Sequence, residues 1–488
     1  MEIKTHIIKS HEQLSQCSAQ FVNFVRENPG SLRSENYYLL ELDDPLFKLQ
    51  PWPTFIDQQV KNEMKNASLG VLNLLRSIPG RIFSNDHEKI SQYYGISIDM
   101  AKYFLYGVTD AHMHRLLSRG DFILGESGLK CLEFNVNTNL GGLDLPFWES
   151  LYLATPIISE FMNRCHVKIT NRNLYVVLFE HLVNSARSFY THEDEINIAF
   201  IAPPEYHLSQ MAPRERYFNS VYNNVLQSGM NHLGGRIFIC DYSRLKVEGD
   251  DVLCSGKKIH YIVEWRDGFV PDEILELFKN EKILICNGAI AWLLSTKLNL
   301  ALLSETKDSG FFSAEEKEII EKYIPWTRKV VPGETGYHGE RIQLEEFIRT
   351  HREELVLKPL VGTGGKDIYV GRYTSEEKWR GLVDQALSGN DWQDILFSRP
   401  VTEPQWDEFI MKALSIRSWV VQEYIESPTY LYQLGNDGCA EHHMVWGFFV
   451  FGNTYAGGWA RVLPAANKSG VINCHQGARV SVAFEVEE

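Results

Sequence analysis

The sequence predicts a large α+β protein with more than one lobe, and three features of its residue pattern support this class. From residue 11 to about 106, apolar residues recur three and four positions apart, as on helices that bury one face. From about 195 to 290, apolar strands alternate with a helix, which is typical of an open α/β domain. After about residue 353, strand-like runs separated by turn residues predict a further sheet built from hairpins.

Length and charge narrow the class further. The 488 residues exceed what one compact core holds. A formal net charge of −15 disfavours general binding to nucleic acid or to anionic membranes, although a local basic pocket for a phosphate remains compatible with it. No apolar run reaches the roughly 18–20 residues of a membrane helix, and the N-terminus lacks an apolar signal core. We therefore expect a cytoplasmic protein.

The eight cysteines predict neither a zinc site nor a redox motif. They are scattered along the chain, and no two of them form a CxxC pair. Buried or incidental thiols are the simplest interpretation.

The segment SRGDFILGESGLKCLEFNVNT, residues 118–138, contains two strand-like runs joined by the turn residues GESG. Side chains alternate along a strand, so Arg119 and Asp121 share one face of the first run, and Glu133 and Asn135 share one face of the second. A hairpin would place the two pairs side by side. Asp121, Glu133 and Asn135 carry the oxygen ligands that Mg²⁺ prefers. The alternative is an Arg119–Asp121 salt bridge with Glu133 facing solvent.

A second informative segment, LVLKPLVGTGGKDIYV, covers residues 355–370. Lys358 stands near the end of a strand, and Gly362, Gly364 and Gly365 form a turn in which backbone N–H groups can approach a polyphosphate. It is neither a Walker loop nor a dinucleotide fingerprint, because a strand rather than a helix follows. An ordinary structural turn is the alternative.

Downstream, the strand VVQEYI contains Gln422, Glu423, Tyr424 and Ile425. Taken together with the glycine turn, this strand is typical of a hinge whose backbone pairs with the edge of an adenine. The apolar run AIAWLLSTKLNLALLSE predicts one helix, and this helix contains Lys297.

These segments resemble the ATP-grasp superfamily, and RGDF…LKCLEFNVNT resembles the glutathionylspermidine synthetase-type enzymes within it. The resemblance covers residues 111–478 in islands, including STKLNLALLSE and the late strand NTYAGGWARVL, which contains Arg461. It implies a circularly permuted ATP-grasp fold, because Asp121, Glu133 and Asn135 precede Lys358 in the chain. The sequence departs from the family pattern after Asn135, where NTNLGGLDLP replaces Thr-Pro-Thr.

The resemblance also implies a division of the chain and a reaction. The expected parts are an N-terminal helical region (1–110), metal-ligand strands with following helices (111–190), an α/β domain (191–290) and nucleotide-binding lobes (291–488). The implied activity is an ATP- and Mg²⁺-dependent carboxylate–amine ligase that acts through an acyl phosphate, with a small-molecule or peptide carboxylate and an amine acceptor as substrates.

The implied roles are specific to residues. Asp121, Glu133 and Asn135 would hold Mg²⁺, with two ions expected, and Lys297 and Lys358 would bind phosphates. Arg119 would stabilise the transferring phosphoryl group or the substrate carboxylate, and Arg461 would bind a carboxylate or the acyl phosphate. Lys329 is the alternative to Lys297 as the first phosphate-binding lysine.

Three other functions stay open at this point. The same fold supports a natural-product peptide ligase or an ATP-dependent phosphotransferase that lacks the amine step. A non-catalytic ATP-binding protein is the third possibility.

Overall fold

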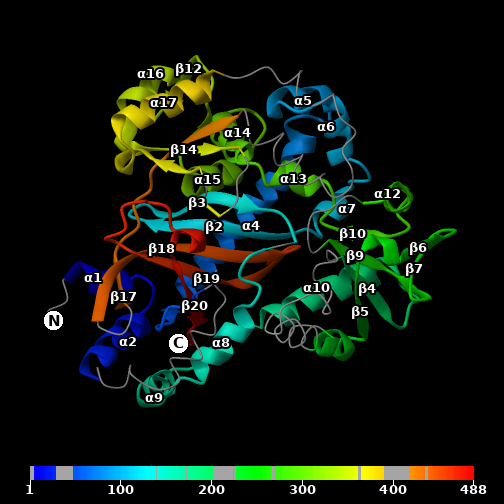
Figure 1. Ribbon diagram of the computed structural model, residues 1–488, viewed down its shortest axis with the longest axis horizontal. Helices are drawn as coiled ribbons and strands as arrows, with labels where there is room; N and C mark the ends of the chain where they lie inside the picture. The colour runs from blue at the N-terminus through cyan, green and yellow to red at the C-terminus, as the bar shows by residue number, and fades with distance from the viewer. Residues whose placement is uncertain are drawn as a thin grey trace.

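A seven-stranded sheet forms the centre of the computed structural model (Figure 1). The structure describes residues 5–28, 48–138, 140–170, 173–201, 224, 227–264, 270–360, 364–365, 367–388, 418–434 and 438–487. The sheet has the order β1-β20-β19-β18-β2-β3, and β17 pairs with β18. Its strands are β1 (Thr54–Ile56), β2 (Leu117–Gly125), β3 (Gly128–Asn135), β17 (Tyr430–Leu434), β18 (Gly438–Phe451), β19 (Thr454–Pro464) and β20 (Arg479–Glu485). Strands from the first third and the end of the chain therefore share one sheet.

The long helix α4 (Gln58–Arg81) packs against four strands of this sheet, β2, β3, β18 and β19. It begins where the side chain of Asp57 accepts a hydrogen bond from the N–H of Val60. Buried Arg76 near its end donates to the carbonyl of Gly452 at 2.7 Å and to the Oδ1 of Asn453 at 2.8 Å, both in the β18–β19 turn. The helix thereby fixes the turn of the hairpin that crosses the middle of the molecule.

A separate parallel sheet forms the α/β part at the right of Figure 1. Its order is β10-β9-β4-β5, with β4 (Ile196–Ile201), β5 (Gly235–Cys240), β9 (Tyr261–Glu264) and β10 (Leu284–Cys286). A small antiparallel sheet of β6 (Leu245–Glu248), β7 (Asp251–Cys254) and β8 (Lys257–Ile259) accompanies it. Asn287, directly after β10, exchanges two side-chain hydrogen bonds with the backbone of Leu117. That contact joins the α/β part to the start of β2.

A third, antiparallel sheet lies in the upper lobe, in the order β11-β16-β14-β15. Its strands are β11 (Thr327–Lys329), β14 (Leu355–Pro359), β15 (Tyr369–Val370) and β16 (Trp419–Glu423). Its neighbours are the hairpin of β12 (Glu334–Tyr337) and β13 (Glu340–Gln343) and the helices α16 (Leu344–Thr350) and α17 (Glu376–Leu387). The expectation of one sheet after residue 353 is therefore wrong: β14 to β16 belong to this sheet, whereas β17 to β20 join the β2–β3 hairpin.

The apolar run from 289 to 305 is also divided. It forms α13 (Ile290–Leu294) and α14 (Leu298–Thr306), and Lys297 lies between them. The side chain of Asn299 donates to the carbonyls of Leu293 and Leu294, so it satisfies acceptors at the end of the first helix. Lys297 is buried at this break between the two helices.

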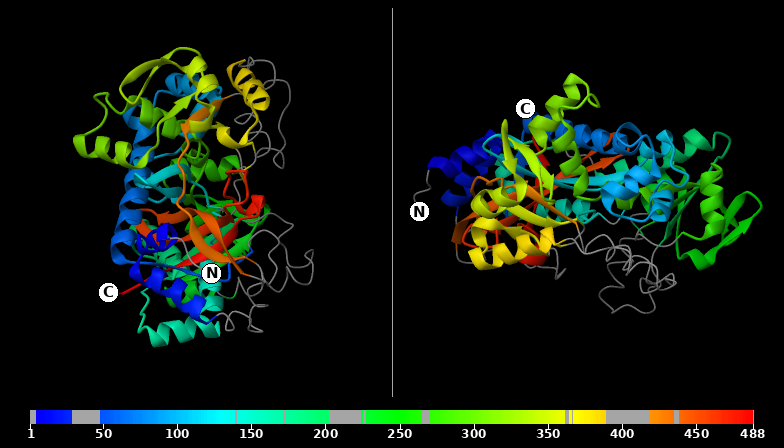
Figure 2. Two further views of the ribbon diagram at one scale, coloured as in Figure 1. Left: turned by 90° about the vertical axis from the view of Figure 1, so that its left-hand side faces the viewer. Right: turned by 90° about the horizontal axis from the view of Figure 1, so that it is seen from above.

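The remaining described helices pack around these sheets (Figure 2). They are α1 (Thr5–Glu12), α2 (Gln16–Glu27), α5 (His87–Tyr94), α6 (Ile98–Phe104), α7 (Asp110–Met113), α8 (Leu145–Leu153), α9 (Pro156–Arg164), α10 (Leu174–Phe189), α12 (Asp272–Lys279) and α15 (Ala314–Tyr323). In the described part of the chain, no helix combines the length and the apolar character needed to cross a membrane.

Candidate active site

The central sheet and the upper sheet meet at a cavity of about 90 Å³. The central sheet contributes Asp121, Glu133 and Arg461, and the upper sheet contributes Lys358 and Gln422. The other lining residues are Ile123, Leu132, Val356, Gly365, Ile368, Val370, Glu423, Tyr424, Ile425, Val445, Gly470, Val471, Ile472 and Asn473. The two segments singled out in the sequence, more than 200 residues apart, therefore border one space.

Strands β2 and β3 pair as the sequence predicts. Arg119 lies opposite Asn135, and Asp121 lies opposite Glu133, so the four side chains share one face of the hairpin. The register then shifts, and Leu132 has no partner on β2. This irregularity frees the carbonyl of Leu132, which accepts a hydrogen bond from the Nζ of Lys358 at 3.1 Å.

Two arginines hold Asp121. The Nε of Arg119 donates to its Oδ1 at 2.8 Å and the Nη2 donates to its Oδ2 at 3.1 Å, while the Nη2 of Arg461 lies 2.9 Å from Oδ2. Asp121 is 2% exposed and Arg461 is 4% exposed. Burial raises the pKa of Asp121, but the two guanidinium groups lower it more, so the net pKa lies well below its ordinary value. The Arg119–Asp121 salt bridge of the alternative interpretation therefore exists, and it is buried.

A glycine makes room for this cluster. Gly447 on β18 lies between Asp121 on β2 and Trp459 on β19. A Cβ at this position would come within 2.8 Å of the indole nitrogen of Trp459 and 3.0 Å of the Cδ of Arg119. The guanidinium carbons of Arg119 and Arg461 lie 5.7 and 5.4 Å from the Trp459 ring. Neither Gly447 nor Trp459 has a sequence signal of its own, and both were missed.

The Gly447→Ala variant is expected to lower the free energy of unfolding by about 1–3 kcal/mol, because the added methyl group displaces Arg119 or Trp459 from a closely packed position. Urea unfolding measures the change. The matched control is Gly438→Ala on the same strand, where the added Cβ meets no atom within 4 Å. Equal stability of the two variants would contradict this account of the packing.

Two lysines approach Glu133 from different elements. The Nζ of Lys297 lies 3.2 Å from the Oε2 of Glu133. Besides its bond to Leu132, the Nζ of Lys358 donates to the Oε1 of Gln422 at 2.6 Å. Burial lowers the pKa of Lys358 to about 8; Glu133 acts in the opposite direction, and Lys297 adds to the lowering. Both lysines are at most 7% exposed.

Gln422 connects β16 to both neighbouring strands. Its amide oxygen accepts from Lys358, and its amide nitrogen donates to the Oγ1 of Thr327 at 3.0 Å. Through Gln422, the position of Lys358 depends on β11 as well as on its own strand.

The glycine turn is covered by the loop between β19 and β20. Gly364 and Gly365 have φ angles of +66° and +69°, which favour glycine, whereas Gly362 lies outside the described residues. A Cβ on Gly364 would come within 2.8 Å of the ring of His475, and one on Gly365 within 2.8 Å of Val471. This close packing leaves a cavity of only about 90 Å³, whereas small-molecule pockets commonly measure about 300–1,000 Å³.

The predicted hinge borders the same cavity. The N–H of Glu423 donates to the carbonyl of Trp326, and the N–H of Tyr424 donates to that of Glu354. Within the described residues, no backbone carbonyl accepts a hydrogen bond from the N–H of Ile425. A Cβ on Gly125, near the tip of the β2–β3 hairpin, would lie 2.7 Å from the Ile425 side chain. Of the three N–H groups, only that of Ile425 lacks a backbone acceptor within the described residues.

The three predicted Mg²⁺ ligands, Asp121, Glu133 and Asn135, lie on one face of the β2–β3 hairpin. Glu133 faces the cavity, and the buried amide nitrogen of Asn135 has no hydrogen-bond partner within the described structure. Turning that amide by 180° would present its oxygen there instead. Asp121 differs, because both of its oxygens already contact arginines. The described residues contain no group of three or more His, Cys, Asp and Glu that could hold a metal. Glu133 and Asn135 therefore fit a first ion better than Asp121 does.

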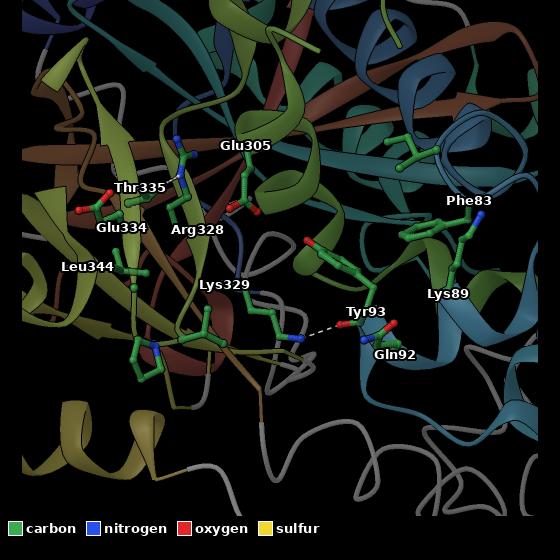
Figure 3. A pocket seen from close by; sticks show the side chains of 14 residues that line it. Phe83, Lys89, Gln92, Tyr93, Glu305, Arg328, Lys329, Glu334, Thr335 and Leu344 are labelled. Atoms are coloured by element: carbon green, nitrogen blue, oxygen red, sulfur yellow. Dashed lines mark hydrogen bonds between the residues drawn. The ribbon is translucent and has the colours of Figure 1, made fainter. Parts of the chain in front are cut away.

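Lys329, the alternative phosphate-binding lysine, lines a different cavity. Its Nζ donates to the carbonyl of Tyr93 at 2.6 Å (Figure 3). Lys297, in contrast, contacts Glu133. The geometry therefore favours Lys297 for the predicted role.

Comparisons with known proteins define the fold class. No protein-family model and no curated protein matches the sequence. The solved structure of a glutathione synthetase-like effector from Globodera pallida, in its apo form, matches 93% of this chain and 99% of its own with 13% identity and a TM-score of 0.53. A structure described as a γ-glutamylcysteine synthetase of Methylobacillus flagellatus matches 82% of this chain and 84% of its own with 11% identity and a TM-score of 0.39. The first similarity shows a glutathione synthetase-like fold.

Proposed function

We propose that this protein is an ATP- and Mg²⁺-dependent carboxylate–amine ligase with a circularly permuted ATP-grasp fold. One observation carries the proposal: four cationic side chains and two carboxylates form one cluster in an otherwise acidic protein. Lys358 and Arg461 line the cavity, and Arg119 and Lys297 contact its carboxylates Asp121 and Glu133. The cations are Arg119, Lys297, Lys358 and Arg461, and all four are buried. Their excess of positive charge suits a phosphate-bearing ligand. The similarity in fold to a glutathione synthetase-like protein supports the same class of reaction.

Each residue of the cluster has its own role in the proposed reaction. Lys297 and Lys358 bind the phosphates, and the backbone of Ile425 pairs with the base. Arg119 and Arg461 stabilise the charge on the γ-phosphoryl group as the substrate carboxylate attacks it and ADP leaves, with Asp121 holding both guanidinium groups in place. Glu133 and Asn135 would hold Mg²⁺, which would neutralise charge on the phosphates. The amine then attacks the acyl phosphate, loses a proton and releases phosphate, so no enzyme nucleophile is needed.

The proposal predicts a reaction that needs two substrates besides ATP. Purified protein with ATP and Mg²⁺ is tested against panels of amino acids, peptides and polyamines, and ADP and phosphate are measured. ADP release that requires both an acid and an amine is the expected result. ADP release with a stable phosphorylated product and no amine would instead assign a phosphotransferase. Binding of ATP without any turnover would assign a non-catalytic protein.

The Glu133→Ala variant is expected to lower turnover by at least about 100-fold, because it removes the ligand that best fits the metal. Its control is Glu126→Ala, which removes an exposed carboxylate at the tip of the same hairpin, outside the cavity. Turnover by Glu133→Ala at the level of the control would exclude the proposed site.

Lys358 predicts a pH dependence. Its pKa of about 8 in the unliganded protein means that the charged form, which binds phosphate, is lost above that pH. The value of kcat/KM for ATP is therefore expected to fall about tenfold per pH unit above pH 8. A flat profile between pH 8 and 10 would show that the charge on Lys358 does not contribute to ATP binding.

A further inference from the structure

A larger cavity, of about 540 Å³, lies away from the candidate active site and shares no lining residue with it. Helix α5 contributes Lys89, Gln92 and Tyr93 to its wall, and β11 contributes Arg328 and Lys329 (Figure 3). The other lining residues are Ile82, Phe83, Glu305, Val331, Pro332, Gly333, Glu334, Thr335 and Leu344. Its volume falls within the range of about 300–1,000 Å³ that is typical of small-molecule sites.

Lys329 is a partly desolvated cation in this wall. Burial lowers its pKa, and Glu305 raises it by a smaller amount. Within the described part of the chain, no carboxylate lies within 4 Å of its Nζ. The bond to the Tyr93 carbonyl uses one of the three donors of the ammonium group, so further donors are free for an anionic group.

Glu305, at the end of α14, is the complementary charge. It forms no ion pair within the described residues. Its charge opposes the lowering of the pKa of Lys329 and of Arg328 that burial causes. Arg328 cannot neutralise a ligand easily, because its guanidinium group already donates to Thr335, Ser304, Thr327 and Gly336. Lys329 and Glu305 are therefore the available positive and negative charges.

The other charges in the wall have partners of their own. Lys89 is paired with Asp86, and Glu334 is paired with Arg341. Between the charged groups, the cavity is lined by apolar and aromatic surface from Phe83, Tyr93, Val331 and Leu344.

We propose that this cavity binds a free α-amino acid with an apolar side chain. An α-amino acid carries its carboxylate and its ammonium group on one carbon, which suits a cavity whose wall contains both a lysine and a glutamate. The carboxylate would contact Lys329, the ammonium group would contact Glu305, and the side chain would lie on the apolar wall. This site is independent of the ligase reaction proposed above, because it uses none of the same residues.

The test is calorimetric titration of the full chain with L-leucine, L-methionine and L-phenylalanine in separate experiments. At least one is expected to bind. The analogues 4-methylpentanoate, which lacks the ammonium group of leucine, and 3-methylbutylamine, which lacks its carboxylate, are expected to bind at least about tenfold more weakly than leucine if leucine binds. No binding of any of the three amino acids at about 10 mM would overturn the proposal.

Variants locate the site. Lys329→Met and Glu305→Gln are each expected to raise the Kd at least about tenfold. The controls are Lys279→Met, which removes another lysine that lies over a tyrosine ring, and Glu318→Gln on α15, and neither should change the Kd. The Lys358→Met variant, altered in the other cavity, should bind the amino acid with an unchanged Kd. An unchanged Kd in both cavity variants, or displacement of the amino acid by ATP, would overturn the assignment.

Discussion

Lys358→Met is expected to lower ATP-dependent turnover by at least about 100-fold while changing the free energy of unfolding by less than about 1 kcal/mol. The fold disfavours the charged lysine, since its pKa falls from 10.5 to about 8. That difference corresponds to a cost of roughly 3 kcal/mol in the free energy of unfolding. The cost is present below pH 8 and is lost as the pH rises toward 10.5. Methionine removes this cost, but it also leaves the acceptors on Leu132 and Gln422 without their donor, which offsets most of the gain.

The matched control for this variant is Lys130→Met. Lys130 is on β3 and, like Lys358, donates to a backbone carbonyl, in its case that of Glu321, but it does not line the cavity. Turnover and urea unfolding are measured for both variants. A Lys358→Met protein that keeps normal turnover would show that the lysine has a structural role only.

Asp121→Asn is expected to lower the free energy of unfolding by about 3–5 kcal/mol. The substitution leaves Arg119 and Arg461 buried without a counter-charge, and an amide can accept from only one of them while its NH₂ group faces the other. Because the folded-state pKa of Asp121 is depressed, the stability that its charge contributes is present at neutral pH and declines as the pH falls below the ordinary range of a carboxyl group.

Asp99→Asn is the control for this second variant. Asp99 forms an exposed ion pair with Lys102 at 3.2 Å, and its loss should change stability by less than about 0.5 kcal/mol. Urea unfolding at constant pH compares the two. If Asp121→Asn lost no more stability than the control, the buried charge cluster would not have the strength that its geometry implies.

Local patterns were sufficient to predict the parts of the fold that depend on neighbouring residues. The β2–β3 hairpin follows from two alternating runs around GESG, and the β14–β15 pair follows from the glycine turn. The division of later strands between two sheets depends on pairing over hundreds of residues: β18 pairs with β2, whereas β16 pairs with β14. Periodicity identifies strands but not their partners, so the single sheet expected after residue 353 was wrong.

For the candidate site as well, local spacing predicted some side-chain positions but not the contacts between distant segments. Spacing alone placed Asp121 and Glu133 on one face, and the structure brings Lys358 to that face. Spacing did not indicate the irregularity at Leu132, which provides an acceptor for the lysine, or the need for glycine at Gly447. These features depend on which atoms meet across strands, and a single sequence does not contain that information.

The most direct test of the account is a crystal structure of the protein with Mg²⁺ and a non-hydrolysable ATP analogue. The account predicts that the phosphates contact Lys297 and Lys358 between the central and upper sheets, with the loop at Val471 moved away from Gly365 and with Glu133 among the metal ligands. A nucleotide bound instead beside Lys329 in the larger cavity, or contacting only one of the two sheets, would contradict it.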